Sequence, residues 1–202
     1  QMTAFTPEDI KKAAAALKEQ RPAYLKMLDF FQAVFVAQEE SKKYIDIEPI
    51  QISDEVLSIK SEQKFSLIDP AGFIIDREAA TKLCLVICDA AKNANPHLAQ
   101  SAQKLVEATQ KGFDLKSLFT DVLQENHAHI DEAAKQLDIE KNVLIFFIYN
   151  SINPAIRLGA EQLSVYLDHQ DPWQQGYCPI FGNPPVLSLL EDEGMRSLIC
   201  SF

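Results

Sequence analysis

The feature that most constrains the fold is a succession of segments whose apolar residues recur at three- and four-residue spacing. This spacing places apolar side chains on one face of a helix, and such faces become buried against one another. The longest segment covers residues 139–168 and contains Pro154, which should kink the helix because it removes one backbone hydrogen bond. Its apolar stripe consists of Leu144, Phe147, Ile148, Ile152, Ile156 and Leu163. We therefore expect a multi-helix bundle.

Helix-start signals divide the remaining chain into further helices. Residues 6–9 read Thr-Pro-Glu-Asp, which combines an N-cap, a proline at the first helical position and acidic residues in the first turn. A helix should follow to about Gln20. By similar reasoning we expect helices over residues 24–41, 77–93, 96–112, 115–123, 130–136 and 139–168. Residues 44–72 carry two prolines and few apolar residues at helical spacing. We therefore expect an irregular connection with a short helix from Ser53.

Composition and charge exclude several classes of partner. The chain has 202 residues and a formal net charge of −10, and this charge repels the phosphates of nucleic acids and the headgroups of anionic lipids. No apolar run reaches the roughly 18 residues that span a bilayer, so no membrane insertion is expected. Residues 1–20 are polar and rich in lysine, unlike a signal peptide. We therefore expect a cytoplasmic protein, and the sequence leaves self-association open.

Four cysteines are present, and they fall into two groups. Cys84 and Cys88 lie four residues apart in an apolar stretch, so they should share one helix face and serve as buried packing. Cys178 and Cys200 lie beyond residue 170. There the helical periodicity stops, and the sequence predicts a linker followed by a strand, a turn and a second strand. We expect a helical domain over residues 1–170 and a small β ribbon over residues 171–202.

The ribbon contains an altered metal-binding motif. The motif Cys-Pro-X-Cys-Gly forms the knuckle of zinc ribbons and rubredoxins, and residues 178–182 read Cys-Pro-Ile-Phe-Gly. The second ligand position therefore holds Phe181. Cys178 and Cys200 supply two of the four ligands that a closed tetrahedral site needs. We predict a partial metal site with two ligands missing and no metal bound in this chain.

Several stretches, in this order, resemble the formate dehydrogenase accessory protein FdhE family. They are 24–33 with 37–38, the loop 65–70, then 146–147, 154–157, Tyr166, Trp173, 178–179 and 182–185. The resemblance implies a helical domain followed by rubredoxin-like modules that bind iron, and a cytoplasmic role in maturing the catalytic subunit of formate dehydrogenase. Phe181 departs from the family pattern. We predict a non-enzymatic accessory protein whose partner is that catalytic subunit, with iron or zinc implied by the family.

Two other functions stay open at the level of sequence. His127 and His129 form a His-X-His motif, which some metal-dependent hydrolases use, although we place it in a polar turn between helices. The chain could equally be a helical interaction module with an unrelated partner. No phosphate-binding loop, nucleophile elbow or His-Glu-X-X-His motif is present. Candidate partner-binding residues, which serve equally well as caps or surface ion pairs, are Asp69, Asp76, Arg77 and Arg157.

Overall fold

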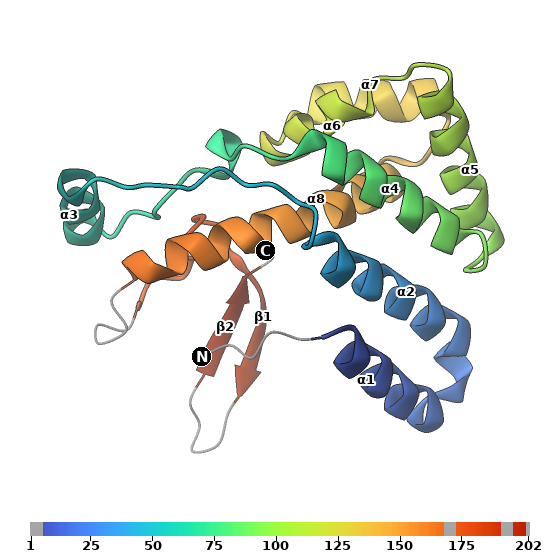
Figure 1. The fold of residues 1–202 in the computed structure, drawn as a ribbon, viewed down its shortest axis with the longest axis horizontal. Coiled ribbons are helices and arrows are strands. Elements are labelled where there is room, and N and C mark those ends of the chain that lie inside the picture. The colour runs from blue at the N-terminus through green and yellow to red at the C-terminus, as the bar shows by residue number, and fades with distance from the viewer. Residues whose placement is uncertain (1–5, 168–172, 191–195, 201–202) are drawn as a thin grey trace. The chain divides into compact units, whose positions relative to one another are not determined.

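The computed structural model describes residues 6–167, 173–190 and 196–200 and confirms a mainly helical fold with a small two-stranded sheet at its C-terminal end (Figure 1). The helices are α1 (Pro7–Gln20), α2 (Leu25–Ser41), α3 (Asp54–Gln63), α4 (Arg77–Ala91), α5 (Pro96–Gln110), α6 (Leu115–Leu123), α7 (His127–Leu137) and α8 (Lys141–Leu163). Short 3₁₀ turns are η1 (Pro22–Tyr24), η2 (Pro70–Gly72) and η3 (Ser164–Tyr166). The strands β1 (Pro185–Leu190) and β2 (Arg196–Cys200) pair antiparallel.

The chain divides into two compact units. The bundle unit comprises Gln1–Asp46 and Ile75–Ala155, and the tail unit comprises Ile47–Ile74 and Ile156–Phe202. Helix α8 begins in the bundle unit and ends in the tail unit. The domain boundary that the sequence predicts at residue 170 falls on residues 168–172, outside the described part of the chain.

The predicted helix starts are confirmed at their caps. The hydroxyl of Thr6 accepts a hydrogen bond from the Asp9 N–H, and the Asp9 carboxylate accepts one from the Thr6 N–H, which completes a capping box. Asp76 caps α4 in the same manner through the Ala79 N–H at 3.0 Å. Each cap satisfies N–H groups that a helix leaves unpaired at its first turn.

The bundle unit is held by a continuous apolar core. Helix α2 packs on α1 and α4, and α4 also packs on α5 and α6. Fully buried side chains of this core include Val34, Leu83, Cys84, Ile87, Cys88, Leu105, Phe119, Leu144, Phe147, Ile148 and Ile152. One buried polar group joins α2 to α8, because the Gln38 Nε2 donates to the Asn150 carbonyl at 2.8 Å. The predicted packing role of both cysteines in α4 is confirmed by their burial.

Two predictions about single positions are wrong: the start of the long helix, and the place of His127 and His129. The long helix begins at Lys141 and not at residue 139, because Asp138 ends α7 with a left-handed backbone (φ 51°). The position of Asp138 is fixed by Lys104, whose Nζ donates to both the Asp138 carbonyl and its carboxylate at 2.6 Å. Helix α7 begins at His127, so His127 and His129 lie in its first turn and not in a connecting turn.

Helix α8 with η3 is also long and apolar enough to cross a membrane by length and composition, and among the described residues it is the one helix of that kind. Half of its most apolar window is buried inside the protein. A core helix passes this test as readily as a membrane span does. The apolar stripe of α8 is therefore explained by the packing of Phe147, Ile148 and Ile152.

We predict that Phe147→Ala lowers the free energy of unfolding by about 3–5 kcal/mol, because it leaves a cavity in a core position that solvent does not reach. Denaturant unfolding followed by circular dichroism measures this change. The matched control is Tyr24→Ala, whose side chain is 55% exposed and whose loss should cost less than about 1 kcal/mol. Equal losses for the two variants would contradict the assignment of α8 to the core.

Candidate functional site

The tail unit builds its knuckle from two segments that are far apart in the sequence. The loop that follows α3 runs alongside residues 177–183, and the two segments are joined by backbone hydrogen bonds. The Leu67 N–H donates to the Pro179 carbonyl and the Ile68 N–H to the Ile180 carbonyl, each at 2.9 Å. The Tyr177 hydroxyl donates to the Lys64 carbonyl. The loop thus supplies a neighbouring strand-like edge for the knuckle.

The knuckle turn is closed by two backbone hydrogen bonds. The Cys178 N–H donates to the Asn183 carbonyl, and the Gly182 N–H donates to the Cys178 carbonyl, both at 2.8 Å. Gly182 has φ 76°, and a Cβ at this position would lie 3.1 Å from the Ser66 Oγ. Both the positive φ and the close approach of Ser66 favour glycine here.

Two cysteines lie at and beside this turn. The backbone N–H groups of Phe181 and Ile180 are directed at the sulfur of Cys178. Cys200 reaches this position because it lies at the end of β2, paired with Pro185 of β1. Burial raises the pKa of the Cys178 thiol, while the two N–H groups act in the opposite direction.

Phe181 occupies the place of the second thiolate and is a core residue of the tail unit. It is buried, and its ring meets that of Phe73 edge to face, with centroids 6.2 Å apart. Phe73 in turn lies against Gly159 of α8, where an added Cβ would come within 2.3 Å of the Phe73 ring. An aromatic contact therefore anchors the knuckle at the position where a metal ligand is expected.

The donor groups of the tail unit do not fit the metal that the family resemblance implies. A tetrahedral iron or zinc site needs four ligands, and Phe181 has no atom that can serve as one. Within residues 6–167, 173–190 and 196–200, no group of three or more histidine, cysteine or acidic side chains is placed to hold an ion. Cys178 and Cys200 thus form a pair of thiols, and we derive no metal chemistry from them.

The four candidate partner-binding residues are divided between the two units. Asp69 and Arg157 belong to the tail unit, whereas Asp76 and Arg77 belong to the bundle unit. Asp69 caps η2 by accepting from the Ala71 N–H at 2.9 Å, and Asp76 accepts from the Asp46 N–H at 3.1 Å. Arg77 donates to the Thr120 hydroxyl at 3.1 Å. Their role in partner binding stays a prediction.

The histidine motif has a local structural explanation. His129 Nδ1 lies 2.9 Å from a carboxylate oxygen of Asp121, whose side chain is almost fully buried. Residues two apart on a helix project in different directions, so His127 and His129 do not converge on one point. The geometry therefore gives no specific support to a metal-dependent hydrolase.

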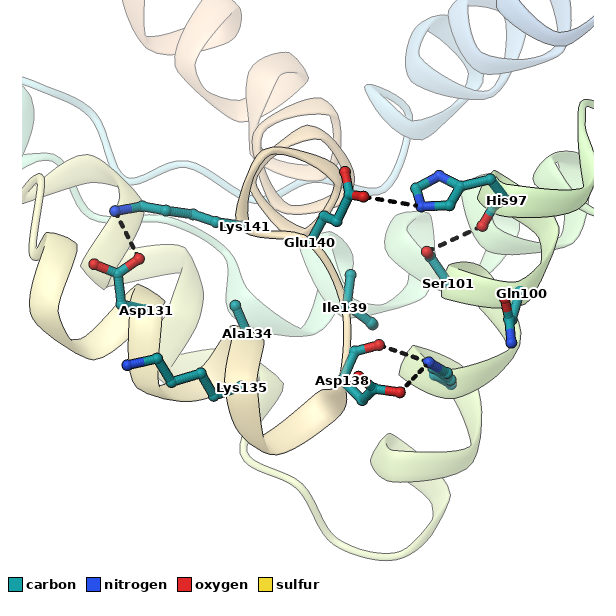
Figure 2. A pocket seen from close by; sticks show the side chains of 11 residues that line it. His97, Gln100, Ser101, Asp131, Ala134, Lys135, Asp138, Ile139, Glu140 and Lys141 are labelled. Atoms are coloured by element: carbon teal, nitrogen blue, oxygen red, sulfur yellow. Dashed lines mark hydrogen bonds and ion pairs between the residues drawn. The ribbon is translucent and has the colours of Figure 1, made fainter.

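A hollow of about 500 Å³ in the bundle unit lies among α5, α7 and the start of α8 (Figure 2). Most of its charged side chains are paired across these elements. His97 faces Glu140 at 3.4 Å, and Lys141 faces Asp131 at 2.9 Å, which lowers the pKa of the Asp131 carboxyl. These ion pairs join α5, α7 and the start of α8. They account for most of the charged residues around the hollow without a bound ligand.

A second hollow, of about 410 Å³, lies in the tail unit and is mostly apolar. It is lined by Ile47, Glu48, Pro49, Ile50, Ile68, Asp69, Gly72, Phe73 and Ile74. Phe73 lines this hollow and also contacts the Phe181 ring, so the hollow and the knuckle share one aromatic side chain. Sequence reasoning missed this site because its residues come from the irregular connection, where no periodicity indicates which side chains turn inward.

We predict that Gly159→Ala lowers the free energy of unfolding by about 1–3 kcal/mol. Replacing glycine by alanine inside a helix normally gains up to about 1 kcal/mol, but here the new Cβ would overlap the buried Phe73 ring. Denaturant unfolding measures the sign. Gly72→Ala is the control, because no atom lies within 4 Å of a Cβ at that position. A stabilised Gly159→Ala protein would contradict the packing described for Phe73.

Comparison of the chain with protein-family models, with curated proteins and with solved structures finds no match. The resemblance to formate dehydrogenase accessory proteins therefore rests on the sequence motifs quoted above.

Proposed function

We propose that this protein is an accessory protein for the maturation of formate dehydrogenase, and that it binds the catalytic subunit without itself being an enzyme. The observation that carries the proposal is the hydrogen bonding between loop 65–70 and the knuckle at residues 178–182. These are two of the segments on which the family resemblance rests. Their meeting in one unit supports the resemblance.

The surface of the tail unit supports a binding role. Strands β1 and β2 expose large apolar side chains on both faces of the sheet: Val186, Leu187, Leu189, Leu190, Leu198 and Ile199. Within the described residues, each strand pairs in the sheet only with the other. A two-stranded sheet is marginal by itself, and an added strand or apolar cover stabilises it.

The apolar hollow offers a second point of contact. Ile74 is 71% exposed at its rim, and Glu48 and Asp69 place two carboxylates beside it. An apolar side chain of the partner fits the hollow, and a basic neighbour of that side chain would meet the carboxylates. This arrangement supports the partner-binding role that the sequence predicts for Asp69.

We predict that the chain retains a formate dehydrogenase catalytic subunit in a pull-down, relative to an unrelated helical protein of similar charge. Leu190→Asp in β1 and Ile74→Asp at the hollow should each weaken this retention about tenfold or more, because each places a charge in an apolar contact. Binding titrations with the purified subunit measure the change.

The matched control is Val165→Asp in η3, since Val165 is 77% exposed and Leu190 is 80% exposed. This variant should bind as the unchanged protein does. Absence of retention above the unrelated helical protein would overturn the proposed function. Equal weakening by all three variants would overturn the assignment of the surface.

A further inference from the structure

Helix α8 contains a proline whose missing N–H leaves one backbone carbonyl without its usual donor. In an α-helix the N–H of each residue donates to the carbonyl four residues earlier, and Pro154 has no N–H to donate to Asn150. The helix nevertheless runs without interruption from Lys141 to Leu163. A carbonyl held away from water costs free energy when it is unpaired, so the Asn150 carbonyl needs a donor from another part of the chain.

That donor comes from α2. The Gln38 Nε2 lies 2.8 Å from the Asn150 carbonyl oxygen and 3.2 Å from the Asn150 Oδ1, so both protons of the Gln38 amide group have acceptors on one residue. Because a backbone carbonyl can only accept, the Gln38 atom that faces it must be the nitrogen. The Gln38 side chain is buried, so water has little access to replace it as the donor.

Two other side chains near the proline bond within α8. The Asn150 Nδ2 donates to the Phe146 carbonyl at 2.8 Å, and the Ser151 hydroxyl donates to the Phe147 carbonyl at 2.6 Å. Both of these carbonyls also face N–H groups of the helix one turn later, so neither bond replaces the one that Pro154 lacks. The amide group from α2 is therefore the one that fills the gap.

The gap lies at the end of the bundle unit. The bundle unit includes α8 as far as Ala155, and the tail unit begins at Ile156, so this turn carries the chain from one unit to the other. A proline-bearing turn is where a long helix bends, and a turn short of backbone bonds is where it opens most readily.

We propose that Gln38 is a latch on this turn of α8. While its amide group is bonded to Asn150, α8 stays closed at Pro154. When the amide group withdraws, the carbonyl is left unpaired and α8 opens locally at the end of the bundle unit. The inference does not depend on the identity of the partner.

Hydrogen exchange of the full chain tests the latch. Gln38→Leu removes the donor while keeping a side chain of similar size. We expect the amides of Ala155 and Ile156, which follow the proline, to exchange about tenfold faster or more in this variant. Amides in α4 should change less, since they report on opening of the core as a whole.

The matched control is Gln32→Leu on the same helix. Gln32 accepts a hydrogen bond from the Lys18 Nζ of α1 at 2.8 Å. Its loss should therefore leave exchange in α8 as it is in the unchanged protein.

Pro154→Ala provides the rescue. Alanine at this position supplies an N–H that can donate to the Asn150 carbonyl, so the turn no longer depends on Gln38. In the Pro154→Ala background, Gln38→Leu should alter exchange of the same amides by less than about threefold. If Gln38→Leu alone does not fold, adding Pro154→Ala should restore folding.

Three results would refute the latch. In the first, Gln38→Leu leaves exchange after the proline unchanged. In the second, it accelerates exchange equally in α4 and α8, which would show a general loss of stability instead of a local opening. In the third, Gln38→Leu has the same effect with alanine as with proline at position 154, including failure to fold in both backgrounds.

Discussion

The tail unit depends on the packing of Phe181 against Phe73, and of Phe73 against Gly159. A small module of loops and two strands has too little apolar surface to fold firmly by itself, and a metal ion usually supplies the missing cross-link. Here an aromatic ring lies at a ligand position of the knuckle and is buried. The glycine in α8 is what lets the supporting ring approach the helix closely. Apolar packing therefore holds the knuckle at the position where the motif Cys-Pro-X-Cys-Gly has its second cysteine.

Two features of the tail unit share this contact. The turn at residues 178–182 is closed by the Gly182 N–H, which donates to the Cys178 carbonyl, and it carries the buried Phe181 ring. The Phe73 ring that supports the knuckle also lines the apolar hollow beside Asp69. The knuckle and the proposed partner contact therefore depend on one anchor.

Most of the helical architecture could be predicted from the sequence, because caps and apolar periodicity are local signals. Thr6, Asp76 and Asp114 each cap the helix predicted for them. The end of α7 could not be predicted, since an aspartate can cap the start of a helix or end one in a left-handed conformation. Lys104, 34 residues away in the sequence, provides the hydrogen bonds that favour the second conformation of Asp138. The packing of the aromatic anchor is likewise non-local, so no pattern indicated that Phe73 would meet Phe181.

Hydrogen exchange of the knuckle amides, with and without a metal chelator, tests the central claim most directly. The amides to follow are those of Leu67, Ile68, Cys178 and Gly182, which donate the backbone bonds described above. The account predicts that their protection is unchanged by the chelator, is lost in Phe181→Ala, and is retained in Phe65→Ala, whose ring is 57% exposed. Protection that disappears on adding the chelator to the unchanged protein would show that an ion, and not the aromatic contact, holds the knuckle.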